Sequence, residues 1–360
     1  MKTLQLYAGP SALRAIGCDG LHPDQFRTIV GASGGPKWFV LYGLDRYLAG
    51  EFFASRQLPL ETIGSSAGAW RLSCLGLKDP LAGIDRLAWH YSRERYSAKP
   101  SAQEITAAAE RLVALVLGSE GAAEIADNPR VRVHIVADRA RLLVSSEHKG
   151  LLSAGLGLSA LGNAVSRRLL GQFFQRVVFH SGPVAAAVQQ WQQFNTVCVP
   201  LRPDNVPGAL LASGAIPIII HGVRDIPGAP PGIYRDGGIT DYHFDAPLRQ
   251  GAGLVLYPHF YSHFTPGWFD KSLPWRRADP AHFDNVLVLA PSPAFVAGLP
   301  FGKIPDRKDF EMLDDATRFA YWQTVLSESA RLADEFSTMV RTGQGVERIL
   351  PLSAAPRART

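Results

Sequence analysis

Two consecutive patterns of strand, glycine loop and helix near the N-terminus constrain the fold more than any other feature of the sequence. Residues 26–30 form a short β-branched run that ends at a glycine cluster, and residues 38–48 follow with apolar side chains at helical spacing. The same order recurs, with an apolar run at 60–63, a glycine loop at 64–68 and a helical pattern at 69–77. Two such units in succession predict parallel strands connected by helices.

The remaining sequence continues this alternation. Further buried strands are expected at residues 131–137, 193–199, 253–257 and 285–289, and a mostly helical region at 309–341. The predicted fold class is therefore α/β, with a mostly parallel central sheet that is flanked by helices on both faces in three layers.

One domain is expected over residues 1–350. The chain has 360 residues, of which 46% are hydrophobic and 19% charged, so it can bury a large core, and no obvious linker divides it. The glycine motifs lie within about 26–250, an unassigned helical part covers about 270–350, and residues 351–360 are expected to form a flexible tail.

Charge and cysteine content narrow the function classes. There are 37 Lys and Arg residues against 32 Asp and Glu, which leaves a net charge of +5. This excess fits either weak attraction to anionic membranes and acidic substrates or an ordinary mixed surface, and no basic run with interleaved aromatics predicts a nucleic-acid partner. The three cysteines, at positions 18, 74 and 198, are too few and too far apart for a disulfide framework or a structural metal site.

The expected location is the cytoplasm. Gly9, Pro10 and Arg14 interrupt the N-terminal apolar residues, so a signal peptide is not predicted. No window reaches the length of about 18 uninterrupted apolar residues that a spanning helix needs. Peripheral contact with the inner face of the membrane is a further expectation, and the oligomeric state is left open.

The first glycine loop, at residues 31–38, predicts a site for an anion. It lies between a strand and a helix, where free main-chain N–H groups and the positive end of the helix dipole converge. The expected donors are the main-chain groups of Gly34, Gly35 and Lys37, because Pro36 has no N–H. The spacing matches neither nucleotide-binding pattern, so the anion is either a phosphate or the oxyanion of a reaction intermediate; a tight turn without a ligand is the alternative.

The second glycine loop contains the pattern Gly-x-Ser-x-Gly. Gly64 and Gly68 flank Ser66 on a predicted strand-to-helix turn, which would expose the hydroxyl at the carboxyl edge of the sheet. The pattern alone occurs often in ordinary glycine-rich turns, but the strand before it and the helix after it favour a nucleophile.

A carboxylate follows much later in the chain, in a segment where Asp236 precedes Gly237 and Gly238. The two glycines allow a turn that leaves the carboxylate exposed at a strand end. Taken alone, an Asp-Gly turn is more often structural than catalytic. Its position after the two glycine loops favours a catalytic role instead.

With these three segments in this order, the chain resembles the patatin-like phospholipase family, whose members are serine lipid acyl hydrolases. That family has a glycine-rich oxyanion loop with a basic residue, then Gly-x-Ser-x-Gly, then Asp-Gly-Gly or Asp-Gly-Ala. Residues 211–217 also resemble the family's Ala-Ser-x-Ala-Ile-Pro stretch. The match departs from the family where Ser33 replaces a glycine and where Trp38 takes the place of the last one.

The resemblance implies a patatin-like fold and a catalytic dyad without histidine, metal or cofactor. Ser66 would attack an ester carbonyl, and Asp236 would accept its proton and later activate the hydrolytic water. The main chain at Gly34, Gly35 and Lys37 would hold the oxyanion, and the Lys37 side chain would add positive charge near a phospholipid head group. Phospholipids, lysophospholipids and simple esters all remain open as substrates, as does acyl transfer in place of hydrolysis.

Residues 151–179 are the best candidate for a surface that meets lipid. Their leucines and phenylalanines alternate with Arg167, Arg168 and Arg176, a composition suited to a membrane interface. A pair of core helices with solvated arginines explains the same pattern. The position of Trp38 likewise fits the start of a helix core or the wall of an acyl groove.

Two other functions stay open. An α/β-hydrolase esterase would use a Ser-Asp-His triad, and four histidines follow Asp236 in the required order: His243, His259, His263 and His282. A lipid-binding scaffold without catalysis would keep the fold and lose turnover.

Overall fold

The computed structural model describes residues 2–248, 251 and 253–355, which form an α/β fold around an 11-stranded mixed sheet. The path through the sheet runs β11-β1-β10-β9-β2-β3-β4-β5-β6, and β7 and β8 pair beside β4. The strands are β1 (Leu4–Ala8), β2 (Phe26–Gly31), β3 (Leu60–Ser65), β4 (Val131–Ala140), β5 (Phe174–His180), β6 (Val197–Pro200), β7 (Val223–Arg224), β8 (Ile233–Asp236), β9 (Leu254–Pro258), β10 (Val286–Pro291) and β11 (Leu350–Pro351).

The middle of the sheet is parallel, as the two N-terminal units predict. Strands β10, β9, β2, β3 and β4 pair in parallel, whereas β1 joins β10, and both β5 and β8 join β4, in the antiparallel direction. The antiparallel strand β8 positions part of the candidate site, because it pairs with β4 in the opposite direction to β3.

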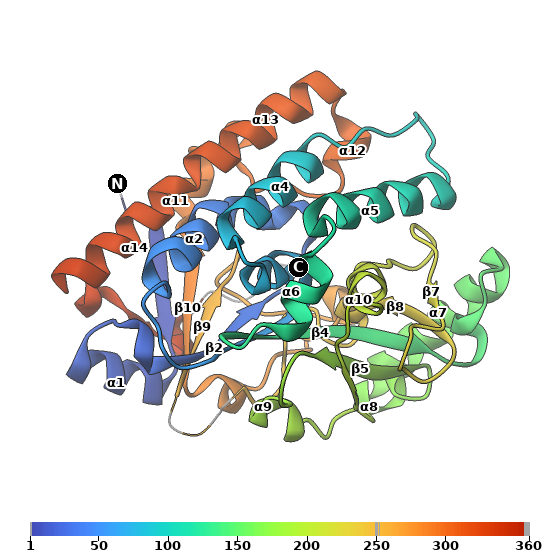
Figure 1. Cartoon of the computed structure of the whole chain (residues 1–360), viewed down its shortest axis with the longest axis horizontal. Helices are drawn as coiled ribbons and strands as arrows, with labels where there is room; N and C mark the ends of the chain where they lie inside the picture. The colour runs from blue at the N-terminus through green and yellow to red at the C-terminus, as the bar shows by residue number, and fades with distance from the viewer. Residues whose placement is uncertain (1, 249–250, 252, 356–360) are drawn as a thin grey trace.

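Helices cover both faces of the sheet. In the view of Figure 1, α2, α4, α13 and α14 lie above the strands, and α1 and α9 lie below them. The helices are α1 (Pro10–Asp19), α2 (Tyr42–Tyr47), α3 (Ala67–Ser73), α4 (Pro80–Ser92), α5 (Ala102–Leu117), α6 (Gly121–Asp127), α7 (Lys149–Val165), α8 (Arg167–Leu170), α9 (Ala186–Gln189), α10 (Val206–Ser213), α11 (Pro293–Ala297), α12 (Asp309–Met312), α13 (Asp315–Glu328) and α14 (Ala330–Thr342). The three-layer α/β prediction is confirmed.

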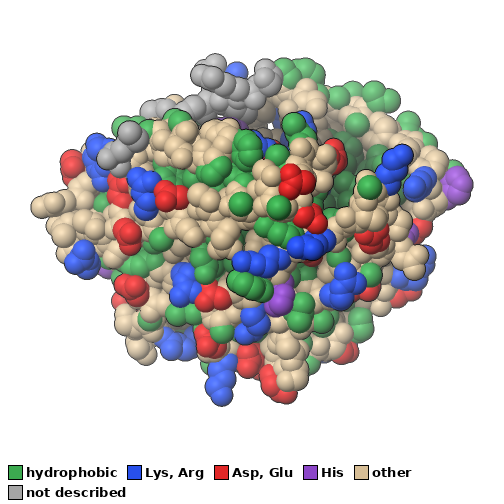
Figure 2. All heavy atoms as spheres, turned by 90° about the horizontal axis from the view of Figure 1, so that it is seen from above, with side chains coloured by type: hydrophobic (Ala, Val, Ile, Leu, Met, Phe, Trp, Pro, Cys, Tyr) green, Lys and Arg blue, Asp and Glu red, His purple; other side chains and the backbone are tan. Residues whose placement is uncertain are grey.

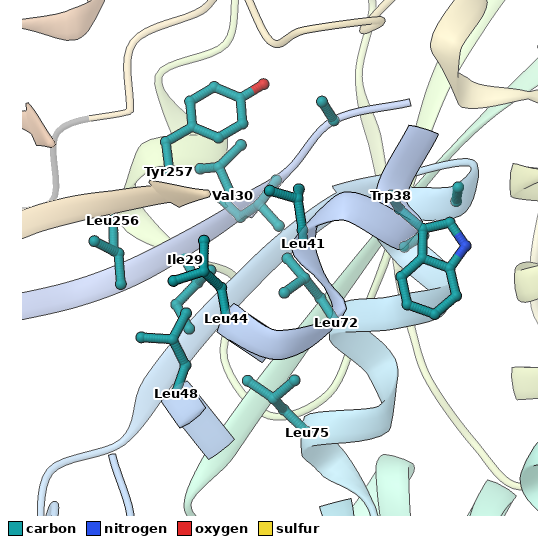
Figure 3. Packing of buried hydrophobic residues seen from close by; sticks show 14 of the residues in the cluster. Ile29, Val30, Trp38, Leu41, Leu44, Leu48, Leu72, Leu75, Leu256 and Tyr257 are labelled. Atoms are coloured by element: carbon teal, nitrogen blue, oxygen red, sulfur yellow. The ribbon is translucent and has the colours of Figure 1, made fainter. Parts of the chain in front are cut away.

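Buried apolar side chains hold the first glycine loop in place. Figure 3 shows Ile29 and Val30 of β2 close to Leu41, which follows the loop, and to Leu72 of α3. Because side chains from both sides of the loop enter one core, the loop cannot move without opening that core. Trp38 is only 1% exposed and belongs to the same cluster. Its burial agrees with the first of its two expected roles, the start of a helix core.

Several elements differ from the sequence prediction. The helix expected at 38–48 is a 3-10 helix (Gly35–Leu41), then α2, then a π-helix (Leu48–Phe52). The strand expected at 193–199 begins only at Val197. The first residues of the tail expected at 351–360 are structured, because β11 pairs with β1 and a 3-10 turn covers Leu352–Ala354; residues 356–360 lie outside the described part.

Residues 151–179 are not a pair of helices with solvated arginines. The segment contains most of α7, the short helix α8 and most of strand β5, which lies between β4 and β6 in the sheet. Arg167 is 4% exposed and Arg176 is fully buried, because each forms an ion pair with a buried aspartate, Asp270 and Asp241 respectively. Only Arg168 of the three arginines is exposed, so the basic half of the expected membrane surface is wrong.

The surface has a mixed charge pattern. On the face shown in Figure 2, acidic and basic side chains are interspersed, in keeping with the small net charge of +5. Within the described residues, no helix combines the length and apolar character that a membrane crossing requires.

Candidate active site

Ser66 lies on a sharp turn between β3 and α3. Its backbone has φ 54° and ψ −130°, a conformation that a residue with a side chain adopts at a cost. The Ser66 N–H donates to Ser213 Oγ at 2.8 Å, and Ser213 Oγ donates to the carbonyl of Val136 at 2.7 Å. This relay ties the turn to β4 and stabilises the strained backbone.

The two glycines of this motif permit close packing around the turn. A Cβ on Gly64 would lie 2.6 Å from the amide nitrogen of Ala69, and one on Gly68 would lie 2.0 Å from the carbonyl oxygen of Gly31. Both distances are far below a normal contact, so no larger residue fits without moving the backbone. The start of α3 is thereby pressed against the end of β2.

Strand register brings Ser66 and Asp236 together. Ser65, the last residue of β3, pairs with Val136 of β4, and Asp236, the last residue of β8, pairs with the next residue, Ala137. Because β3 and β8 run in opposite directions along β4, their carboxyl ends meet. Ser66 Oγ donates a hydrogen bond to Asp236 Oδ2 at 2.8 Å, although the residues are 170 positions apart.

The Asp236 carboxylate is fixed and buried. Its second oxygen, Oδ1, accepts a hydrogen bond from the Gly238 N–H at 2.7 Å. Burial raises the pKa of Asp236, and the hydrogen bonds from Gly238 and Ser66, together with the positive charges of Arg307 and Lys271, act against this rise. A carboxylate with a raised pKa is a stronger base than a solvated aspartate, which suits a group that must take a proton from a serine.

The glycines after Asp236 pack as tightly as those around Ser66. A Cβ on Gly237 would lie 2.1 Å from the carbonyl oxygen of Val136, and one on Gly238 would lie 2.5 Å from Ser33 Oγ. The first contact involves β4 and the second involves the first glycine loop. The Asp-Gly-Gly segment is therefore confined between two of the elements that carry the site.

A buried ion pair anchors the chain beyond these glycines. Both nitrogens of the Arg176 guanidinium fork donate to Asp241, at 2.6 and 2.7 Å. Thr240 Oγ1 hydrogen-bonds to Asp138 and to Asp241, and burial together with the charge of Asp241 raises the pKa of Asp138 well above its usual range. The bidentate Arg176–Asp241 pair fixes both the position and the direction of the chain that follows Gly238.

A chain of hydrogen bonds connects all three loops. Ser33 of the first loop bonds to Ser65 of the second through their hydroxyls at 2.7 Å, and Ser65 Oγ donates to the carbonyl of Asp241 at 2.6 Å. The N–H of Ser33 donates to the carbonyl of Tyr242 at 2.9 Å. Ser33, which departs from the family's glycine, thus bonds both to the nucleophile loop and to the acid loop.

Two of the three expected oxyanion donors have a free N–H group. The N–H groups of Gly34 and Gly35 have no acceptor among the described residues, and Gly34 lines the pocket at Ser66. The Lys37 N–H instead donates to the carbonyl of Gly34 at 3.4 Å, because the chain closes into a 3-10 turn. The main-chain role expected for Lys37 is therefore wrong. Ala67, directly after Ser66, also has an N–H without an acceptor in the described chain.

The pocket at the dyad is nearly closed. It has a volume of about 10 Å³, which is room for a single water. Its walls are Ser33, Gly34, Ser66, Ile216, Pro217, Asp236, Gly238, Ile239, Tyr242, Trp268 and Arg307. An ester can enter only if some of these side chains move. The bulky side chains of Ile216, Trp268 and Arg307 can move without breaking a hydrogen bond to Ser66 or Asp236.

Sequence reasoning missed several of these residues. Ser213 lies in the 211–217 segment that resembles the family, but its hydrogen bond to Ser66 needs the fold to be seen. Trp268 and Arg307 lie in the part of the chain that carries no recognised motif. No signal in the sequence places these two beside Ser66.

The histidines of the triad alternative do not reach the dyad. None of the four lines the pocket or hydrogen-bonds to Ser66 or Asp236. His243 and His259 are buried, and burial lowers the pKa of each. His282 bonds to Asp245 at 2.8 Å. In the described part of the chain, no three His, Cys, Asp or Glu side chains gather as metal ligands.

Comparison of the chain with family models, with curated proteins and with solved structures finds no match to any of them. The resemblance to patatin-like phospholipases therefore stays a prediction from motifs. Any assignment of function has to be argued from the geometry around Ser66 and Asp236.

Proposed function

We propose that the protein is a serine lipid acyl hydrolase, of the phospholipase A, lysophospholipase or esterase type, that uses Ser66 and Asp236 as its catalytic dyad. The observation that carries this proposal is the 2.8 Å hydrogen bond from a serine on a strained strand-to-helix turn to a buried carboxylate. A serine in such a turn needs a neighbouring base to become a nucleophile, and Asp236 is the base within reach.

The reaction proceeds through an acyl-enzyme. Ser66 Oγ bonds to the ester carbonyl carbon while its proton passes to Asp236, and the oxyanion that forms meets the free N–H groups of Gly34 and Gly35. The intermediate then loses the alcohol, which takes the proton from Asp236. Water attacks the acyl group, Asp236 accepts a proton from it, and that proton returns to Ser66 as the fatty acid leaves.

Apolar surface near the site supports a lipid substrate. Ile239 and Trp268, which line the pocket, also belong to a small core with Leu152 and Leu156 of α7. The opposite face of α7 leaves large apolar side chains exposed: Leu151, Leu158, Leu161 and Val165. A helix that packs against the pocket on one side and exposes leucines on the other suits peripheral contact of a cytoplasmic enzyme with the membrane.

The primary test is hydrolysis of p-nitrophenyl butyrate by three purified variants. Ser66→Ala and Asp236→Asn are each expected to reduce kcat by about a thousandfold or more, because each removes one half of the proton-transfer pair. EDTA is expected to leave the activity of the parent protein intact. His282→Ala serves as the matched control and should keep the parental rate.

Two outcomes would favour the alternatives. Near-parental activity of Asp236→Asn would end the dyad proposal, and loss of activity in a variant of His243, His259, His263 or His282 would favour the triad. A fluorophosphonate probe covers the scaffold alternative, since it labels an activated serine whatever the substrate. Labelling is expected at Ser66 in the folded protein and should be lost in Ser66→Ala.

A further inference from the structure

Three basic side chains gather at the mouth of the dyad pocket. Arg307 lines the pocket together with Ser66, and its side chain passes the first glycine loop, where a Cβ on Gly35 would lie 3.4 Å from Arg307 Cγ and 3.5 Å from its Nε. The Lys271 Nζ lies 3.8 Å from the ring centre of Tyr242, which also lines the pocket. Lys37 belongs to the same loop, is half-buried and lies close enough to Arg307 for the two charges to interact.

None of these three cations has an ion-pair partner within the described ranges 2–248, 251 and 253–355. The acids of the neighbouring segment are already engaged, because Asp306 and Asp309 both pair with Lys303. Asp309 also accepts a hydrogen bond from the Trp322 indole at 3.0 Å. Lys303 neutralises one of these two negative charges, and Asp236 is the acid among the described residues that line the pocket.

The three cations repel one another. Burial, then Arg307 and Lys37, lower the pKa of Lys271 to about 7, while Asp236 raises it. Burial also lowers the pKa of Lys37 to about 8, with Arg307 and Lys303 acting in the same direction and Asp306 and Asp309 against it. Lys271 as a whole is nevertheless exposed, and it borders a second cavity of about 720 Å³. Three cations without ion-pair partners in the described chain therefore lie close together, and a bound anion would reduce the electrostatic repulsion among them.

We infer that Arg307, Lys271 and Lys37 bind an anionic group of the substrate next to the scissile ester, so that the preferred substrates are acyl esters that carry a phosphate or a carboxylate. This inference rests on the proposed hydrolase function and names its substrate class. The guanidinium of Arg307 offers a fork of donors that matches both anions, and the lysines add charge around it. The charged group has two possible sources, a phospholipid head group or a small water-soluble ester.

Stabilisation of the reaction oxyanion is a weaker explanation for the cluster. That oxyanion is a single transient charge, and the N–H groups of Gly34 and Gly35, which have no acceptor among the described residues, are already assigned to it in the proposed mechanism. The two explanations differ in what they predict. A residue that stabilises the oxyanion lowers kcat for every ester, whereas a residue that binds a substrate anion raises KM for charged esters only.

The kinetic test compares esters that differ in charge. The water-soluble pair is p-nitrophenyl butyrate and mono-p-nitrophenyl succinate, and the lipid pair is monooleoylglycerol and its phosphate ester in neutral detergent micelles. The parent protein should prefer the charged member, and Arg307→Gln and Lys271→Gln should each raise its KM by about tenfold, as expected for loss of a charge-assisted hydrogen bond. Because both cations also act on the pKa of Asp236, each variant is judged by the ratio of kcat/KM for the charged to the neutral member at one pH, which should fall by about tenfold. Lys99→Gln, which removes an exposed lysine, is the charge-matched control.

The lipid and soluble pairs separate the two sources of the anion. Preference in both pairs supports recognition of the anion wherever it is carried, and preference in the micelle pair alone supports a lipid head group. Equal loss of activity on charged and neutral esters in Arg307→Gln would overturn the inference in favour of oxyanion stabilisation.

A binding measurement keeps the inference testable if no ester is hydrolysed. Calorimetric titration of Ser66→Ala with hexyl phosphate and with 1-hexanol requires no turnover. Tighter binding of hexyl phosphate, lost on adding Arg307→Gln, supports the anion site whatever the reaction is. Equal binding of the two ligands would overturn it even if ester hydrolysis were found.

Discussion

Asp236 illustrates how a single residue can serve a reaction and weaken the fold. In the proposed mechanism its ionised carboxylate accepts the proton of Ser66, yet burial makes the ionised form unfavourable and raises the pKa. The hydrogen bonds from Gly238 and Ser66 offset part of this effect. Active sites commonly retain such unfavourable groups because the chemistry depends on them.

Replacement of this carboxylate is therefore expected to stabilise the protein at neutral pH. In the unfolded chain Asp236 ionises near its ordinary pKa of 3.8, whereas in the folded chain it holds its proton to higher pH. Folding is thus penalised increasingly as the pH rises from that value to the folded-state pKa, and the penalty is constant above it. Asp236→Asn removes the penalty, so its free energy of unfolding at pH 7 should exceed that of the parent protein.

Urea unfolding at pH 7 and at pH 3 measures this difference. The advantage of Asp236→Asn should shrink at the lower pH, where the carboxyl is protonated in both states. Ser66→Ala, which leaves the carboxylate in place, should show no comparable change with pH. A lower free energy of unfolding for Asp236→Asn at pH 7 would contradict this prediction. It would mean that the positive charges around Asp236 stabilise its ionised carboxylate more than burial destabilises it.

The residues of the dyad were predictable, and their surroundings were not. Motif order pointed to Ser66 and Asp236 because each sits beside glycines that its turn requires. Arg307 and Trp268 lie in no recognisable sequence motif. Their position beside Ser66 depends on how the C-terminal third of the chain packs against the sheet. The main-chain role of Lys37 failed because it depended on a helical start that is instead a 3-10 turn.

At the scale of elements, the same limit explains the error over residues 151–179. A sequence shows that Arg167 and Arg176 lie among apolar residues, but not that their acid partners lie 103 and 65 positions further on. Burial of an arginine is possible only with such a partner. The alternation of apolar and basic residues was consequently interpreted as a surface, although residues 174–179 belong to the buried strand β5.

The exposed face of α7 gives a prediction about membranes. Leu161 is 68% exposed and Val165 is 80% exposed, so a charge at either position should leave the fold intact. If this face enters the lipid interface, Leu161→Glu combined with Val165→Glu should reduce sedimentation with phosphatidylglycerol vesicles by about tenfold, since two apolar anchors are lost.

Hydrolysis of p-nitrophenyl butyrate in solution by the same double variant should stay at the parental rate. Leu115→Glu, at a position of α5 that is 48% exposed, is the control for the charge change and should sediment as the parent does. Unaltered vesicle binding of the double variant would remove α7 from the membrane surface.

For the whole molecule, the C-terminal region proves to be part of the core that carries the site. Trp322 of α13 is fully buried and its ring lies 5.2 Å from that of Phe39, which directly follows the first glycine loop. Phe336 of α14 lies 6.0 Å from Tyr47 of α2. The unassigned residues therefore pack against the segment that follows the first glycine loop, and the expectation of one domain predicts that they unfold together with Ser66 and Asp236.

Trp322→Ala tests this cooperativity. Loss of a buried tryptophan costs about 3–5 kcal/mol, and the indole bond to Asp309 is lost as well. In a single cooperative unit, the helical signal in circular dichroism and fluorophosphonate labelling of Ser66 should disappear at the same urea concentration, and the variant should shift both equally. Trp275→Ala, at a position that is 63% exposed, should shift neither. Labelling that persists after much of the helical signal is lost would show that α13 and α14 form a separate unit behind an independently folded site.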